Sequence, residues 1–300
     1  MAVQIPFVRE IEFEYGAPQQ VSPLIRRVVA NNPSPFTFHG TGVYIIGKGE
    51  VAVIDPGPDQ PGHLGVLLAA LAGQKLTHIL VTHGHLDHSP MAGPLSRATG
   101  APIFAAGGVM QAATHDVQVE AGDDDSFTPD KFVADGQRFS GPDWTLEAVF
   151  TPGHTSNHMC YALLEENALF SGDHIMGWST TVITPPDGDM GAYYASLQKV
   201  LDRNYETLWP THGPPVRAVR SFIEAYIAHR HDREAQILER LAAGQTRITD
   251  MVPIMYAAVD TRLYPAASHS VLAHLIHMVR SGRATCSGAP SLKSEFRIPS

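Results

Sequence analysis

The sequence predicts an α/β protein in which mixed sheets are covered by helices. Two apolar hairpins, residues 43–54 and 159–171, have strand-like runs on both sides of turn residues. Helical patterns over residues 61–72 and 90–98 alternate with strand-like runs, which is the order of βαβ units. Polar side chains of metal-binding type follow several of the apolar runs. Open α/β sheets build their sites at such strand ends, so we expect one site at a sheet edge.

The densest group of these polar residues is at positions 83–88, directly after the apolar run 78–81. It contains His83, His85, Asp87 and His88, separated only by a glycine and a leucine. Imidazole nitrogens and carboxylates are typical zinc ligands. A strand that ends in a tight loop can hold the first two histidines on one side and turn the next two residues toward a neighbouring position. The spacing therefore predicts ligands for two metal ions.

Three other apolar runs end in the same way. The runs 146–150, 167–170 and 207–211 are followed by His154, Asp173 and His212, respectively. Because the context repeats in order, unrelated core or surface histidines are a poor alternative explanation.

Composition indicates an ordinary globular protein. Its 300 residues, 44% hydrophobic and 17% charged, allow one large domain or a domain of about 200 residues with a smaller one. Residues 1–10 contain no long apolar segment, and Cys160 and Cys286 are too few for a disulfide framework. We therefore expect a cytoplasmic protein that does not interact with membranes, with Cys160 as a small core residue.

The charge is unevenly distributed along the chain. Residues 216–300 hold 11 of the 21 basic but only 7 of the 30 acidic side chains, a balance of +4 against −13 for residues 1–215. The change of sign directly after His212 favours a domain boundary between residues 215 and 216.

The remaining elements follow from periodicity. Residues 5–30 alternate apolar and polar side chains and predict two strands, interrupted at residues 16–18. Apolar stripes predict helices over residues 189–204 and 216–243. The segments 248–259, 268–280 and 282–285 indicate a helix, a second helix and a β-wing, in that order.

The pattern His-Gly-His-Leu-Asp-His at residues 83–88 resembles the HxHxDH signature of the metallo-β-lactamase superfamily, and the later ligand positions are matched in order. The resemblance implies an αββα sandwich: two mixed sheets covered by helices, with the metals between two similar halves. The C-terminal pattern resembles the small winged-helix domain of the lactamase-beta-2-like branch. We therefore expect a catalytic domain over residues 1–215, then a linking helix and a winged-helix-like domain over residues 216–300.

The resemblance also implies roles for the site residues. One ion would be held by His83, His85 and His154, a second by Asp87, His88 and His212, with Asp173 bridging both. Two Zn²⁺ ions per chain are expected, although Mn²⁺ and Fe²⁺ also suit such ligands. Asp55 matches the signature aspartate of the first hairpin and would support the ligand loop.

This site predicts hydrolysis by a metal-bound hydroxide, with Asp87 as the catalytic residue that orients it. The expected substrate is a small ester, thioester or lactone, because residues 1–215 are strongly acidic. Single-stranded RNA is the alternative substrate, since this branch contains RNA endonucleases. A non-enzymatic alternative is a winged-helix regulator that senses a ligand, and a winged helix can also serve in packing or in a homodimer. The sequence contains no phosphate-binding loop or serine nucleophile elbow that competes with the metal site.

Several other polar groups have simpler interpretations. The acidic run 123–125 reads as a solvated loop, and residues 230–233 read as a solvated helix face. His274 and His277 share a helix face, but no cysteine or carboxylate accompanies them, which argues against a second metal site. Residues close to Asp173 are expected to line the substrate pocket: Trp178, Thr180 and Thr181. His158 is expected either to support the site or to be an ordinary strand histidine.

Overall fold

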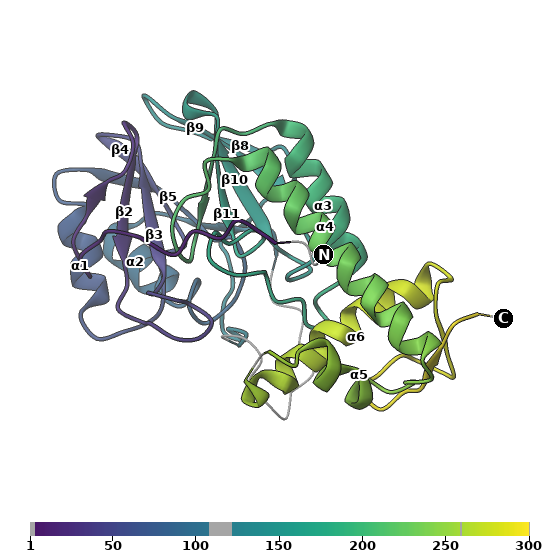
Figure 1. Cartoon of the computed structure of the whole chain (residues 1–300). Coiled ribbons are helices and arrows are strands. Elements are labelled where there is room, and N and C mark those ends of the chain that lie inside the picture. Colours follow the sequence, from purple (N-terminus) through teal and green to yellow (C-terminus); the bar gives the residue numbers. More distant parts are fainter. Residues whose placement is uncertain (1–3, 108–121, 259, 300) are drawn as a thin grey trace.

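Two mixed β-sheets lie face to face at the centre of the computed structural model, which describes residues 4–107, 122–258 and 260–299 (Figure 1). The first sheet has seven strands in sequence order, parallel from β4 to β7 and antiparallel before that. Its strands are β1 (Gln19–Gln20), β2 (Ile25–Val29), β3 (Gly42–Ile46), β4 (Glu50–Ile54), β5 (Lys75–Leu80), β6 (Ile103–Ala105) and β7 (Lys131–Phe132).

The second sheet has five strands in the order β12-β11-β10-β9-β8, and only β11 and β12 are parallel. Its strands are β8 (Arg138–Ser140), β9 (Thr145–Phe150), β10 (Met159–Leu163), β11 (Ala168–Gly172) and β12 (Thr207–Pro210). Four helices accompany the sheets: α1 (His63–Ala70), α2 (Ala92–Thr99), α3 (Met190–Arg203) and α4 (Val219–Ala242).

Alternation along the strands creates three apolar layers, because successive side chains of a strand point to opposite faces. In β3, Tyr44 and Ile46 face the second sheet, whereas Val43 and Ile45 pack on the side of α1 and α2. In the second sheet, Tyr161 packs between the sheets, and Cys160 packs toward α3 and α4. The expected αββα sandwich and the core position of Cys160 are both confirmed.

The C-terminal part forms a fourth core around α4, α5 (Ile248–Met255), α6 (Tyr264–Arg280) and the two-stranded wing β13 (Thr285–Cys286) and β14 (Phe296–Arg297). This is the expected winged helix. The long helix α4 belongs to two cores: its first half, with Phe222, packs on the second sheet, and its second half, with Ile237, packs on α5 and α6. The boundary after residue 215 stays a prediction.

Some sequence expectations differ from the structure. The first of the two strands expected within residues 5–30 is absent; of the described residues before β1, only Tyr15 forms a single bridge, with Val29. The helix expected over 248–259 ends at Met255, and Val259 lies outside the described residues. Alternation alone cannot distinguish a strand from an extended segment that packs irregularly.

Residues 230–233 are not a fully solvated helix face, because Arg230 is buried against the catalytic domain. Its guanidinium donates a hydrogen bond to the carbonyl of Thr181 and lies over the Tyr193 ring at 5.4 Å. The sequence does not indicate that Arg230 is buried, because its partner, the Thr181 carbonyl, lies in a loop that is distant in sequence.

A buried ion cluster joins α4 to α6 and the wing. Glu234 on α4 accepts hydrogen bonds from His277 Nδ1 at 2.8 Å and His274 Nδ1 at 3.5 Å, and from Arg283. The expectation that no carboxylate accompanies these histidines is wrong, because Glu234 approaches from a different helix. Burial favours a higher pKa for Glu234, but the hydrogen bonds from His274, Arg283 and His277 outweigh it and lower the pKa to about 2.

We predict that Glu234→Gln lowers the free energy of unfolding by about 2 kcal/mol at neutral pH, because it removes a charge that holds three buried or half-buried donors. The pKa in the folded state is below the usual value of 4.5, so this stabilisation is complete above about pH 4.5. It is then lost as the pH falls toward 2. Urea titrations at several pH values measure the difference between variant and wild type.

The matched control is Glu224→Gln on the same helix. Glu224 is 56% exposed and lies 3.8 Å from Arg220, so the change should cost less than about 0.5 kcal/mol. Equal losses in the two variants would contradict the importance of the Glu234 cluster.

Within the described ranges, no helix combines the length and apolar character needed to cross a membrane.

Candidate metal centre

The structure brings all seven predicted ligand residues together at one edge of the sandwich. They come from loops after β5, β9, β11 and β12, so both sheets contribute. Their ligand-type atoms form three overlapping groups in which all atoms lie within 4.8 Å of one another. The groups are His83 with His85 and His154, His83 with His88 and Asp173, and Asp87 with His88 and His212. Each of the seven residues is at most 8% exposed.

Asp173 lies between the two predicted ion positions. Its Oδ2 is 3.9 Å from His154 Nε2, and its Oδ1 is 3.6 Å from His88 Nε2 and 3.4 Å from His212 Nε2. Asp87 Oδ2 is 3.0 Å from His212 Nε2. One carboxylate therefore faces histidines of both sets, as a bridging ligand requires.

Each histidine in the cluster has one ring nitrogen near a fixed oxygen, which leaves the other nitrogen directed toward the shared centre. The outer contacts are His83 Nδ1–Thr82 Oγ1 at 3.0 Å, His85 Nε2–Asp123 Oδ1 at 3.6 Å, His88 Nδ1–Asp55 Oδ2 at 2.9 Å, His154 Nδ1–Val182 O at 2.7 Å and His212 Nδ1–Gly40 O at 3.2 Å. Such outer partners fix the orientation and tautomer of metal-binding imidazoles.

Asp55, directly after β4, organises the ligand loop. Its carboxylate accepts hydrogen bonds from the backbone N–H and the hydroxyl of Thr82, both at 2.8 Å, and from Thr211 Oγ1 at 2.9 Å. The predicted supporting role of Asp55 agrees with these contacts. His158 also supports the site, because its Nε2 accepts a hydrogen bond from the backbone N–H of Asp173 at 3.2 Å.

A glycine is required before His154. Gly153 has φ +142°, and a Cβ there would lie 2.4 Å from the Cα of Tyr193. The loop that carries His154 can therefore approach α3 only without a side chain at this position.

The protonation of the cluster divides it into two halves. Burial lowers the pKa of His85 to about 3, and nearby His154 adds to the effect. Burial also disfavours the charged form of His212, but Asp173 and Asp87 outweigh it and raise the pKa to about 10. One half thus offers neutral imidazoles, and the other half pairs positive charge with two carboxylates, which are the groups that a divalent cation would meet.

The donor set fits divalent metal ions. Asp87 Oδ1, His88 Nε2 and Asp173 Oδ1 are buried and have no hydrogen-bond partner among the described residues. Buried polar atoms normally have partners, so inward-directed nitrogen and oxygen atoms without them indicate a cation-binding centre. The roles of the individual ligands stay a prediction.

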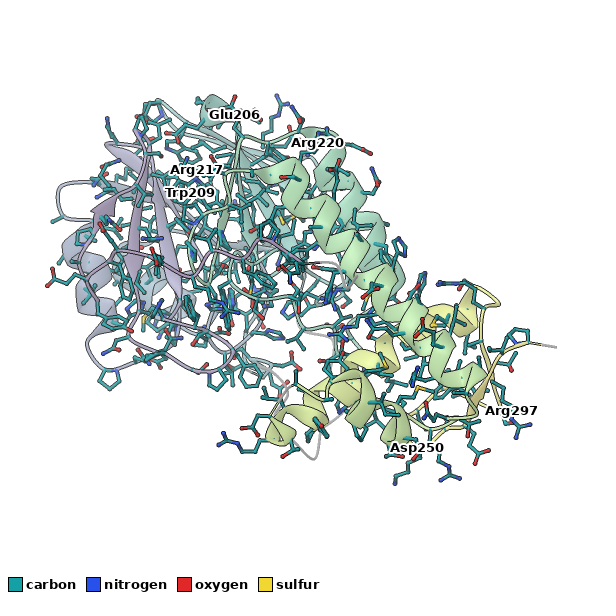
Figure 2. The ribbon with its side chains drawn as sticks, in the orientation of Figure 1. Glu206, Trp209, Arg217, Arg220, Asp250 and Arg297 are labelled. Carbon is teal, nitrogen blue, oxygen red and sulfur yellow. The ribbon has the colours of Figure 1, made fainter. Side chains whose placement is uncertain are left out.

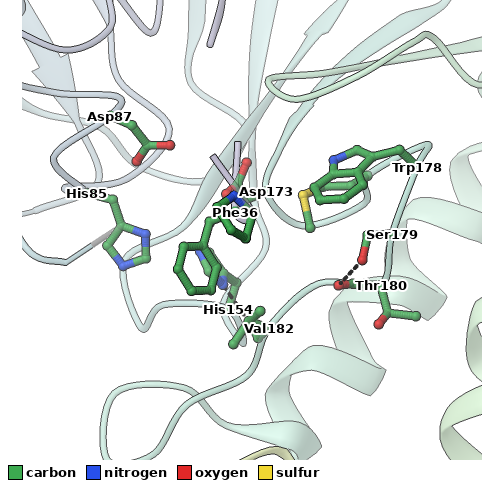
Figure 3. Close-up of a pocket in the computed structure, with 11 residues that line it drawn as sticks. Phe36, His85, Asp87, His154, Asp173, Trp178, Ser179, Thr180 and Val182 are labelled. Carbon is green, nitrogen blue, oxygen red and sulfur yellow. Dashed lines mark hydrogen bonds and ion pairs between the residues drawn. The ribbon is translucent and has the colours of Figure 1, made fainter. Parts of the chain in front are cut away.

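A small cavity of about 40 Å³ opens onto the centre (Figure 3). Phe36, Trp178, Thr180 and Val182 line it together with His85, Asp87, His154 and Asp173. Trp178 and Thr180 lie where the sequence placed them. Thr181 does not line the cavity; its hydroxyl donates to the carbonyls of Asp173 and His174, at 2.8 and 3.0 Å.

Two contributors to the site were missed in the sequence. Phe36 comes from a loop distant in sequence, and no motif marks it. Asp123 lies beside His85, and the neighbouring Asp124 is buried, with Oδ2 accepting from Ser89 Oγ at 2.8 Å. The interpretation of residues 123–125 as a solvated loop is therefore wrong for these two residues. The acidic run was visible in the sequence, but such runs usually lie in solvent, so the run alone did not point to a role at the metal centre.

Comparison with known proteins agrees with this fold and site. Residues 37–212 match the family described as the metallo-beta-lactamase superfamily, and residues 248–289 match the beta-lactamase associated winged helix domain. The chain belongs to the metallo-β-lactamase superfamily. It is a hydrolase of this superfamily with a histidine and aspartate metal site, and it carries the associated winged helix.

Two relatives and one solved structure illustrate the similarity. A beta-lactamase-like protein 2 homolog of Drosophila melanogaster is 32% identical over 283 residues, which cover 91% of this chain and 92% of the relative. An atrochrysone carboxyl ACP thioesterase of Claviceps purpurea is 31% identical over 252 residues, covering 82% and 74%, respectively. A beta-lactamase domain protein of Burkholderia ambifaria shares the fold, with a TM-score of 0.78 at 20% identity over 95% of this chain and 94% of that one.

We predict that Asp55→Asn weakens metal binding about 10- to 100-fold, the usual effect of losing an outer carboxylate. Asparagine tolerates the positive φ of +47° at this position, so the backbone should be retained. The amide cannot accept hydrogen bonds at both of its ends, and His88 loses part of its support. Competitive chelator titration measures the affinity. Asp59→Asn, on the exposed part of the following loop, is the control; an equal affinity in both variants would show that Asp55 does not position the ligands.

Proposed function

We propose that this protein hydrolyses a small thioester, ester or lactone, with a thioester as the best-supported substrate. The observation that carries the proposal is the cavity of about 40 Å³ over Asp87 and Asp173, which admits a reacting carbonyl group and little more. The similarity to a relative named as an ACP thioesterase supports the choice of a thioester. Two zinc ions are the proposed metals, in accordance with the nitrogen and oxygen donors.

Divalent ions held by the seven residues would supply water activation and polarise the substrate carbonyl. The protein's own contribution centres on Asp87. Burial favours a higher pKa for this carboxyl, but His88 and His212 lower the pKa to about 2, so it is ionised at neutral pH. Its Oδ1 has no hydrogen-bond partner in the described part of the chain and is available to orient the attacking water.

Hydrolysis of a thioester then requires few groups. The water oxygen bonds to the carbonyl carbon, the carbon–sulfur bond breaks, and the sulfur leaves as a thiol after taking up a proton. Phe36 and Trp178 cover the reacting group and limit the access of bulk water.

RNA receives less support from the structure than a small substrate does. Two arginines of the winged helix that could contact phosphates form ion pairs within the protein, Arg280 with Asp189 and Arg283 with Glu234. Figure 2 shows other C-terminal arginines far apart: Arg220 lies at one end of α4, and Arg297 lies near its opposite end. Arg220 and Arg297 therefore do not belong to one basic patch, whereas a nucleic-acid surface needs basic side chains gathered on one face.

The test is a substrate panel with the metal-loaded protein: an acyl thioester, the matching oxygen ester, a lactone and single-stranded RNA. We expect kcat/KM for the thioester to exceed that for the oxygen ester at least tenfold. Asp87→Ala should lower kcat by more than about 10²-fold, with an unchanged circular dichroism spectrum, because it removes the group that orients water.

Asp125→Ala, an exposed aspartate of the acidic run, is the matched control and should retain activity. Salt-sensitive RNA cleavage that Asp87→Ala abolishes, together with inert thioesters, would replace this proposal by the nuclease function. A cytoplasmic location and a homodimer stay predictions.

A further inference from the structure

A second and much larger cavity, of about 720 Å³, lies between the catalytic domain and the winged helix. Its walls are mainly apolar and come from three segments. The lining includes Leu272, Ile276 and Val279 of α6, Leu292 of the wing, and Pro185 and Pro186 of the loop before α3. This volume is within the range of small-molecule binding sites, whereas the cavity over the metal centre is far below it.

Charged groups at this cavity favour an anion. Arg280 pairs with Asp189, so these two charges balance each other. The exposed residue Lys293 also lines the cavity, and its ammonium has no hydrogen-bond or ion-pair partner within the described ranges. Asp189, Arg280 and Lys293 together give the lining one net positive charge next to apolar walls.

The loop over residues 182–189 contributes to the lining of both cavities. At its start, Val182 lines the metal cavity, and its carbonyl accepts the hydrogen bond from His154. Further along, Asp187 Oδ2 accepts from Ser156 N at 3.0 Å, and Asp189 N donates to Gly153 O at 2.9 Å. The loop is therefore fixed to the segment that carries His154.

The distance along this loop is short. Pro185 lines the large cavity and is three residues from Val182, a span of at most about 11 Å. A substrate with its carbonyl at the metal centre must place most of its length elsewhere, and the large apolar cavity, which shares the 182–189 loop with the metal cavity, has the volume to hold it.

We propose that this interdomain cavity binds the 4′-phosphopantetheine arm of an acyl thioester. The arm is a chain of methylene groups and amides, with a dimethyl-substituted carbon and a hydroxyl near its terminal phosphate. Its hydrocarbon parts suit the apolar walls, and its phosphate suits a cation. Its chain lies against Ile276 and Leu292, and its phosphate contacts Lys293, with Arg280 nearby. This inference rests on the thioester function proposed above and extends it to recognition of the leaving group.

The test compares two thioesters that differ only in the phosphate: an acyl-4′-phosphopantetheine and the same acyl-pantetheine. We expect the wild type to prefer the phosphorylated substrate about tenfold in kcat/KM, mainly through KM, which is the effect of one hydrogen bond to a charged group. In Lys293→Ala this preference should fall to about one. Lys48→Ala, in the exposed turn between β3 and β4, is the matched control and should keep the preference.

Calorimetry with free 4′-phosphopantetheine makes the test independent of turnover. Binding to the wild type and to Lys48→Ala, weakened about tenfold in Lys293→Ala, supports the site. An absence of binding, or equal affinity in all three proteins, overturns it. Hydrolysis of both thioesters without any preference would overturn the site and leave the thioesterase function intact, whereas phosphopantetheine binding with inert thioesters would count against the function itself.

Discussion

The buried carboxylate of Asp55 is the constraint on which the active-site edge depends. It is fully buried, and a buried carboxylate is tolerated only where donors surround it. The donors come from both halves of the sandwich: Thr82 and His88 follow β5 of the first sheet, and Thr211 follows β12 of the second. The Asp55 side chain thus links the edges of the two sheets. The same hydrogen bonds fix the loops that carry the metal-binding residues after β5 and β12.

This arrangement explains why the chemistry lies between the sheets and not on either one. The neutral histidines belong mainly to the first sheet's loop, whereas Asp173 and His212 come from the second sheet. The residues that would hold two ions come together only where these edges meet. The hydrogen bonds from His154 to the Val182 carbonyl and from His212 to the Gly40 carbonyl also link these histidines to the loops that carry Gly40 and Val182.

Much of this could be predicted from the sequence, because the ligands follow strands and strand ends converge. The seven residues follow from short-range patterns of this kind, whereas the αββα sandwich and the supporting role of Asp55 were implied by the resemblance to the metallo-β-lactamase superfamily. What the sequence did not reveal depends on contacts between distant segments. Phe36 reaches the cavity from a loop, Arg230 is buried by a carbonyl on another element, and Glu234 meets two histidines 40 and 43 residues further along the chain. The periodicity of apolar residues in the sequence does not predict such long-range contacts.

The central claim is that the edge between the sheets holds two metal ions, and the metal content of the protein tests it most directly. Protein purified without chelators and analysed by plasma mass spectrometry, together with anomalous diffraction at the metal edge, should show about two ions per chain. One ion should lie among His83, His85 and His154, and the other among Asp87, His88 and His212. A stoichiometry near one, with no anomalous signal beside Asp87 and His88, would contradict the account.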